Sequence, residues 1–276
     1  MAQSVFPLLP PQELTPSRDT IHIYSQVLGA VRRALMPPQK HWWHISLRAA
    51  AAGLTTTPVP FADLTFEMLL DFTAHEFCLS TSEGDWWNMT LRGQPAHEFA
   101  EETLTALRTL GVDVHIERDK FRDEARRAYD TIIVEDYWQA ASQVDVLLKQ
   151  FKGELREETS PVQLWPHHFD LSLVWFSGRL APGVDAADAE HADEQMAFGF
   201  STGDDGVREP YFYITAYPWQ DALFESTLPV GASWHKEGWK GALLPYKSLT
   251  ESAQPKELLL DFWRTVQKAG AALMQD

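Results

Sequence analysis

The chain has 276 residues, 45% hydrophobic and 22% charged, which is the composition of a globular protein with a substantial core. Its 23 basic and 39 acidic side chains give a net charge of −16, and a surface of that sign repels phosphate backbones and anionic lipid heads. We therefore expect neither a nucleic-acid partner nor a membrane partner.

The cysteine content and the lack of long apolar runs bear on the compartment. A single cysteine, Cys78, leaves no pair for an internal disulfide. The first residues lack the basic and apolar regions of a secretory signal, and no apolar run reaches the roughly 18 residues of a membrane span. These features predict a cytoplasmic protein in a reducing environment.

Helical and strand-like patterns follow one another along the first half of the chain. Apolar residues recur at three- and four-residue spacing between Asp19 and Leu35, which is typical of an amphipathic helix, and the prolines between Val5 and Pro16 predict an extended lead-in. The expected elements are a helix at 19–35, a long strand at 41–51, short strands at 66–72, 76–82 and 86–91, a helix at 95–111 and a strand at 112–116. The short strands follow one another through tight turns and should pair antiparallel.

The second half repeats this plan. A charge-rich stretch at 119–130 predicts an exposed connector, and the acidic stretch at 183–194 predicts a surface insertion. The expected elements are a helix at 135–155, a long strand at 162–176, a hairpin of strands at 195–200 and 210–217, and a last helix from Pro255. Alternation along the second hairpin strand puts one set of side chains on a common face, namely Tyr211, Tyr213, Thr215 and Tyr217.

A similar string of residues stands in each long strand, at 41–47 and at 167–173. Aligned without gaps, His44 meets Asp170. Because successive residues of a strand point to opposite faces, each copy has a polar face. These faces carry His44, Ser46 and Arg48 in the first copy, and His168, Asp170 and Ser172 in the second.

The order of elements and the repeated string predict the fold class. We expect an α+β protein, with an antiparallel sheet, helices packed on one side, and an internal pseudo-repeat of helix, strands and helix. The two repeat halves would be residues 1–118 and 131–276, joined by the connector at 119–130. We expect them to form one compact unit.

Several short motifs resemble those of a known family. They are His41-Trp42-Trp43-His44, Gly53-Leu54-Thr55-Thr56, Ser160-Pro161-Val162, Phe169-Asp170-Leu171, Phe176-Ser177-Gly178-Arg179 and Ala216-Tyr217-Pro218. Together they are similar to a family of uncharacterised bacterial proteins of about this length, known only as a domain of unknown function. The resemblance covers nearly the whole chain and implies no activity, substrate or cofactor.

The polar faces of the two matching strands define the predicted site, because strands that lie near one another would bring them to one cleft between the halves, a favoured place for a ligand. We expect His44 to act as a general base and Asp170 to fix the tautomer of its imidazole. Arg48 or Arg179 would clamp an anion. The expected ligand-binding residues are Trp42, Ser46, Arg48, His168, Ser172, Arg179, Tyr213 and Tyr217. The sequence thus predicts binding of a small polar or anionic organic molecule, with hydrolase- or isomerase-type turnover as its enzymatic form.

A metal-dependent enzyme is one alternative. His41, His44, His167, His168 and Asp170 are of ligand type, but His41 and His44 would point to opposite faces of a strand, and the chain has neither a His-Glu-x-x-His string nor paired cysteines. We therefore expect no cofactor and assign no metal ligand. A zinc or iron site would have to be assembled from both halves.

Two further alternatives do without catalysis. In one, His44 and Asp170 satisfy buried hydrogen bonds across the sheet. In the other, exposed rings among the 11 tryptophans and seven tyrosines form a surface for a protein partner. The sequence does not indicate an oligomeric state.

Overall fold

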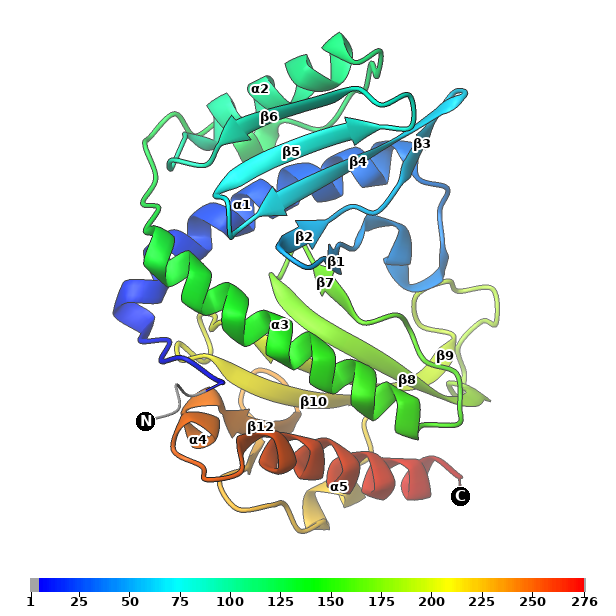
Figure 1. The fold of residues 1–276 in the computed structure, drawn as a ribbon. Helices are drawn as coiled ribbons and strands as arrows, with labels where there is room; N and C mark the ends of the chain where they lie inside the picture. Colours follow the sequence, from blue (N-terminus) through cyan, green and yellow to red (C-terminus); the bar gives the residue numbers. More distant parts are fainter. Residues whose placement is uncertain (1–4, 276) are drawn as a thin grey trace. The chain divides into compact units, whose positions relative to one another are not determined.

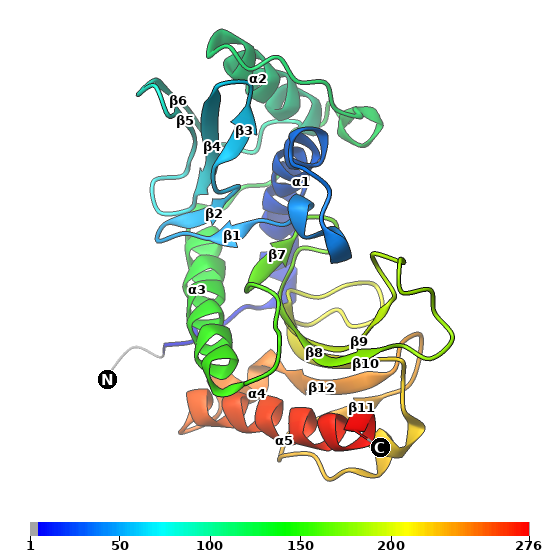
Figure 2. The ribbon, with the colours of Figure 1, turned by 90° about the vertical axis from the view of Figure 1, so that its right-hand side faces the viewer.

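The computed structural model describes residues 5–275, which form two compact units (Figures 1 and 2). We call Gln12–Trp138 with Leu164–Phe169 the N-terminal unit, and Met1–Pro11, Gln139–Gln163 and Asp170–Asp276 the C-terminal unit. Each unit is therefore assembled from separate stretches of the chain.

The N-terminal unit contains an antiparallel sheet and two helices. Its elements are α1 (Pro11–Leu35), the 3₁₀ turn η1 (Lys40–Ile45), β1 (Arg48–Ala49), β2 (Gly53–Thr55), β3 (Val59–Phe61), β4 (Leu64–Asp71), β5 (Glu76–Thr81), β6 (Trp86–Thr90), α2 (Ala96–Thr109) and the 3₁₀ turn η2 (Asp119–Phe121). The strands follow the order β1-β2-β4-β5-β6, with β3 paired to β4. All of these pairings are antiparallel.

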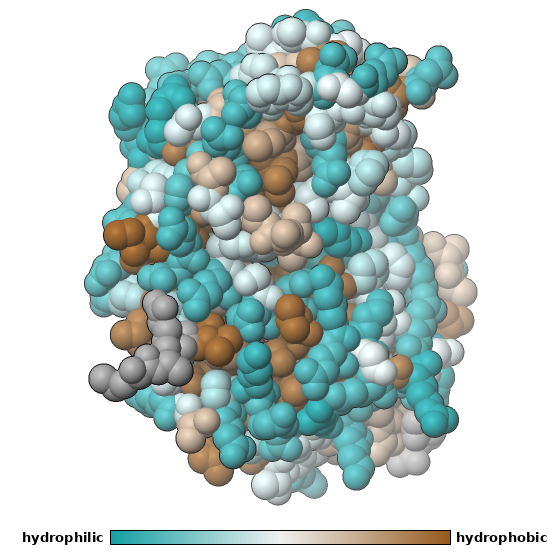
Figure 3. Space-filling model, viewed as in Figure 1, coloured by the Kyte–Doolittle hydropathy of each residue, from teal (hydrophilic) through white to brown (hydrophobic). Residues whose placement is uncertain are grey.

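Both helices of this unit cover the same face of its sheet (Figures 1 and 2). Tyr24 of α1 stacks on Phe99 of α2 with ring centroids 4.0 Å apart, and Phe99 meets Phe77 of β5 edge-on at 5.5 Å. The register places Leu69 beside Cys78 on the opposite face, where Figure 3 shows hydrophilic and hydrophobic residues interspersed. The sheet is thus apolar on its helix-covered side and mixed on the other, as expected of an antiparallel sheet.

The C-terminal unit contains a second sheet. Its elements are most of α3 (Thr131–Glu154), β7 (Gln163–Trp165), β8 (Asp170–Leu180), β9 (Asp193–Ser201), β10 (Tyr211–Tyr217), η3 (Asp221–Glu225), β11 (Ser233–His235), β12 (Gly241–Pro245), α4 (Tyr246–Thr250) and α5 (Pro255–Gln275). The sheet order is β11-β12-β10-β9-β8-β7. Residue Gln163 of β7 belongs to this unit, and the rest of β7 belongs to the N-terminal unit.

Helices α3 and α5 pack on one face of this second sheet. Phe198 of β9 lies against Phe151 of α3 at 5.0 Å, and Phe212 of β10 lies against Trp263 of α5 at 6.3 Å. Phe198 and Phe212 are fully buried. The predicted fold class, α+β with an antiparallel sheet and helices on one side, is confirmed, whereas the duplication of the two halves stays a prediction.

Most of the expected elements are confirmed. Strands β4, β5 and β6 form the predicted antiparallel series, and α2, α3, α5 and the β9–β10 hairpin lie where the sequence places them. The register of β10 also confirms that Tyr211, Tyr213, Thr215 and Tyr217 share one face, opposite Phe212.

The expected strand at 41–51 is wrong. Residues His41 and Trp42 have left-handed backbone angles, with φ of 53° and 57°, and the chain winds into η1. The backbone N–H of Ser46 then donates to the carbonyl of Trp43 at 3.3 Å, which closes the turn. Strand pairing begins only at Leu47, which bridges to Leu164, and continues in β1.

Other boundaries also differ from the predicted ones. Helix α1 begins at Pro11 instead of Asp19. No helical bond needs the N–H that Pro11 lacks in the first turn, and Pro16 lies inside the helix. Residues 112–116 alternate between buried and exposed, but they form no strand pairing in the described chain. The long strand expected at 162–176 is interrupted before Asp170, since Phe169 has φ of 57°. Within the expected connector, Phe121 is buried.

One buried carboxylate in the C-terminal unit is only half satisfied. Asp145 of α3 is 5% exposed; its Oδ2 accepts a hydrogen bond from Lys149 Nζ at 2.5 Å, while its Oδ1 has no partner among the described residues. Burial raises the pKa of Asp145 above its ordinary value of 3.8. The charged form therefore weakens folding at neutral pH.

We predict that Asp145→Asn raises the free energy of unfolding at neutral pH by about 1 kcal/mol. Because the folded-state pKa is raised, this gain should be full above that pKa and should shrink as the pH falls toward 3.8. Urea unfolding over this pH range measures it, with the exposed Asp261→Asn as the control. A variant less stable than the parent at neutral pH would contradict the prediction.

Candidate functional site

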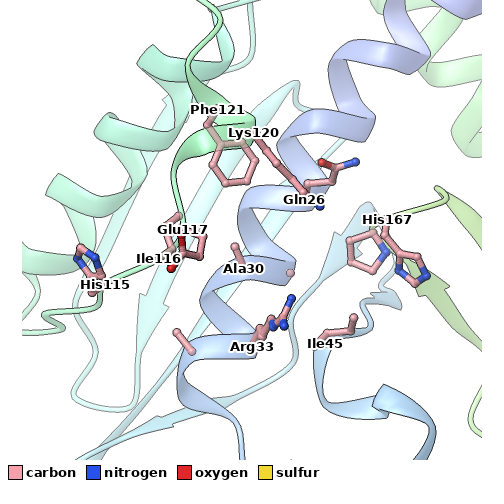
Figure 4. A pocket seen from close by; sticks show the side chains of 13 residues that line it. Gln26, Ala30, Arg33, Ile45, His115, Ile116, Glu117, Lys120, Phe121 and His167 are labelled. Atoms are coloured by element: carbon pink, nitrogen blue, oxygen red, sulfur yellow. The ribbon is translucent and has the colours of Figure 1, made fainter. Parts of the chain in front are cut away.

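A groove of about 480 Å³ lies over helix α1 within the N-terminal unit (Figure 4). We call it the α1 groove. Its floor is one face of α1, formed by Gln26, Gly29, Ala30, Arg33 and Ala34. Residues three, four and seven apart lie on the same side of a helix, so this floor follows from the helical repeat.

One wall of the groove comes from the segment just before β8. Pro166 packs so closely on α1 that a Cβ at Gly29 would lie 2.8 Å from its Cγ. The backbone groups of Leu47 and Leu164 exchange two hydrogen bonds of 2.9 Å, which bring this segment alongside. His167 follows Pro166 in the same wall, and Ile45 completes it.

The opposite wall is the extended segment after α2. Ile116 and Phe121 are 3% exposed and present apolar surface to the groove, whereas Glu117 and Lys120 are exposed. A 2.5 Å ion pair between Arg118 and Glu101 ties this segment back to α2. The wall is thus apolar at its base and charged at its rim.

At one end of the floor, Gln26 is oriented by His22. Its Nε2 lies 2.9 Å from the Nε2 of His22, whose ring stacks on Phe169 at 5.2 Å. Burial, with a smaller contribution from Arg18, lowers the pKa of His22. His22 is therefore neutral near pH 7 and can accept a hydrogen bond from the Gln26 amide.

The groove carries two cations that the described part of the protein does not neutralise. No side-chain hydrogen bond or ion pair joins Arg33 or Lys120 to another described residue, although the Arg33 guanidinium lies 5.3 Å from the centre of the Trp42 ring. Glu117 is the carboxylate in the lining. In a chain with a net charge of −16, this is a locally positive site.

Next to the groove, the buried side chain of Arg32 holds the turn η1 in place. Its Nε donates to the carbonyl of His44 at 3.0 Å, and its Nη1 donates to the carbonyl of Thr56 and to the Thr57 hydroxyl. No described carboxylate pairs with it. Burial, aided by the nearby charge of Arg48, lowers the pKa of Arg32 to about 10. Arg32 therefore stays protonated at neutral pH and acts through backbone carbonyls.

Half of the sequence-predicted site residues lie in the N-terminal unit, namely Trp42, His44, Ser46, Arg48 and His168. His44 is 4% exposed; its Nδ1 accepts a hydrogen bond from the Gln39 N–H at 3.2 Å, and burial, followed by the charges of Arg32 and Arg33, lowers its pKa. Nδ1 as acceptor places the proton on Nε2 in this neutral ring.

The other predicted residues of this unit fall into local pairs. Arg48 Nη1 donates to Ser46 Oγ at 2.7 Å, and Trp42 stacks on His44 at 5.5 Å. The His168 ring lies 4.4 Å from that of His167. The structure therefore groups Ser46 with Arg48 and Trp42 with His44.

The remaining predicted residues lie in the C-terminal unit, namely Asp170, Ser172, Arg179, Tyr213 and Tyr217. The Tyr213 hydroxyl donates to Asp170, and the strand register sets Ser172, Gly199 and Tyr213 in one row across β8, β9 and β10. The Tyr213 ring covers Gly199, where a Cβ would lie 2.3 Å from Cζ. Enclosure and the Asp170 charge raise the pKa of Tyr213, which stays a hydrogen-bond donor.

Arg179 and Tyr217 lie apart from this row. Arg179 Nη1 donates to the carbonyl of Met274 in α5 at 2.7 Å, and Tyr217 pairs with Gln195 and meets His191 edge-on at 5.9 Å. The structure thus brings together Asp170, Ser172 and Tyr213. The predicted partnership of His44 and Asp170 joins residues of different units and stays a prediction.

The α1 groove was missed from the sequence. Its cations stand in segments far apart in the sequence, and the sequence suggests His167 only as a residue of metal-ligand type. One signal was present: Gly29 stands inside a helical pattern, where glycine costs stability and so indicates close packing of another segment. Among residues 5–275, no group of three or more His, Cys, Asp or Glu side chains is placed to hold a metal ion.

We predict that Arg32→Met lowers the free energy of unfolding by about 2 to 4 kcal/mol, because it leaves two buried carbonyls without their donor. Chemical denaturation measures this change. The neighbouring Arg33→Met removes an exposed charge and should change stability by less than about 0.5 kcal/mol. Equal losses of stability in the two variants would argue against a structural role for the Arg32 hydrogen bonds.

We predict that Gly29→Ala lowers the free energy of unfolding by about 1 kcal/mol, because the added methyl group collides with Pro166. The same change at Gly153 of α3, where a Cβ would meet nothing within 4 Å, should instead stabilise by about 0.5 to 1 kcal/mol. Thermal or urea unfolding of both variants tests the pair. Stabilisation by both substitutions would show that Pro166 can shift away from α1 without loss of stability.

Comparison with known proteins identifies the family of the chain. No described helix is both long enough and apolar enough to cross a membrane. No curated protein and no solved structure matches the chain. Residues 6–275 match the model described as "Family of unknown function (DUF5996)". The chain belongs to this family.

Proposed function

We propose that the protein binds a small organic anion in the α1 groove. The observation that carries the proposal is the presence of two lining cations, Arg33 and Lys120, which form no ion pair with a described residue. In a chain rich in carboxylates, unneutralised cations on one concave surface favour an external anion.

The size and lining of the groove agree with this proposal. Small-molecule sites typically enclose about 300 to 1,000 Å³ and are mostly apolar with a few polar groups. The α1 groove has about 480 Å³. Its apolar surface comes from Ala30, Ile45, Ile116, Phe121 and Pro166. A ligand with an organic body and an acidic group fits both kinds of surface.

The proposal concerns ligand binding, and it also covers the origin and the compartment of the protein. The resemblance to bacterial proteins and the single, half-buried Cys78 favour a bacterial origin and the reducing cytoplasm. Hydrolase- or isomerase-type turnover by His44 and Asp170 stays a separate prediction, because neither residue lines the α1 groove.

We predict that an organic anion binds in calorimetric titrations and that its affinity falls about tenfold in Arg33→Gln and in Lys120→Gln, the loss typical of one charge-assisted hydrogen bond. The ligand panel should contain carboxylates and organic phosphates of different lengths. Arg126→Gln and Lys268→Gln are matched controls, because they make the same charge change at exposed positions outside the groove.

Equal weakening by the groove variants and the controls would mean that the net charge, not the groove, attracts the ligand. Absence of binding by every anion in the panel would also contradict the proposal.

A further inference from the structure

The two cations of the α1 groove stand at different ends of it. Gln26 and Arg33 are seven residues apart on α1, which is about 10 Å along the helix axis. Figure 4 shows Lys120 reaching toward Gln26 at one end of this floor, whereas Arg33 lies at the other. The positive charges are thus separated along the groove instead of being joined in one cluster.

Most of the stretch between these ends is made of small or apolar groups, with Glu117 and His167 at its two sides (Figure 4). Gly29 and Ala30 leave the floor low, and Ile45 and Ile116 face it from the two walls (Figure 4). Such a surface cannot solvate a charge, but it favours methylene or aromatic groups. A ligand that fills it should be apolar in the middle.

We infer that the ligand is an elongated dicarboxylate, with one acidic group at Arg33, the other at Lys120, and an apolar chain between them. This inference rests on the proposed function, since it assumes that the groove binds anions. It names the charge pattern that the groove recognises. A carboxylate at each end neutralises a cation that has no described ion-pair partner.

Glu117 favours a competing charge pattern. As the carboxylate of the lining, it would favour an ammonium group at one end and so an ω-amino acid. The lining has two cations to this one acid, and Glu117 is exposed at the rim, where water screens its charge. The dicarboxylate therefore fits the groove better than the ω-amino acid.

The test is calorimetry with three compounds of equal chain length: suberate, octanoate and the corresponding ω-amino acid. Suberate should bind about tenfold more tightly than octanoate, because it gains a second charge-assisted contact. Succinate is too short to reach both ends and should have no such advantage over butyrate. The advantage of suberate should disappear in Arg33→Gln and in Lys120→Gln and persist in Arg126→Gln and Lys268→Gln.

Equal binding of suberate and octanoate, weakened by the groove variants, would overturn the inference and leave the proposed function standing. Tighter binding of the ω-amino acid would overturn it as well, and would assign one end to Glu117. Failure of every anion to bind would remove the proposed function together with the inference.

Discussion

The buried guanidinium of Arg32 is the interaction on which the candidate site depends. It donates to the carbonyl of His44 and thereby holds η1 against the end of α1. The turn sets Ile45 in the groove wall and leads to Leu47, whose backbone bonds to Leu164 bring in the segment that carries Pro166. The motif at 41–44 thus forms the turn that directs the chain from α1 toward β1.

The charges of the groove contrast with those elsewhere in the molecule. Carboxylates outnumber basic side chains, and other exposed arginines do find acidic partners, such as Arg92 with Glu98 at 2.6 Å and Arg264 with Glu154 at 2.6 Å. Arg33 and Lys120 form no such pair with a described residue. Exposed cations such as Arg126 and Lys268 also form no ion pair with a described residue, so Arg33 and Lys120 are distinguished by their place in the lining of the groove.

The fold was predictable from the periodic patterns of apolar residues. Burial of one face produces both the helical spacing of Val27, Val31 and their neighbours and the alternation along 210–217. Each residue's polarity therefore indicates which face it occupies. The turn at His41 and Trp42 was not predictable in this way. Left-handed backbone angles at these residues are imposed by surrounding contacts, and the alternation of polarity alone favours a strand.

The candidate site was harder to predict for a related reason. The groove formed by 26–34, 115–121 and 166–167 depends on how distant segments pack. In the sequence, only Gly29 indicates that another segment packs closely on α1. The row of Asp170, Ser172 and Tyr213 was easier, because strand alternation and hairpin register determine which side chains meet.

The discontinuous make-up of the N-terminal unit has a consequence for biosynthesis. Its last segment, Leu164–Phe169, is translated well after α1, and the whole of α3 lies between them in the sequence. A nascent chain that has not yet released Pro166 from the ribosome contains the floor of the groove and the wall at 115–121, but lacks Pro166 and His167 of the other wall. Closure of such a sequence-distant contact is slow, so the binding surface matures late in synthesis, after its helix has formed.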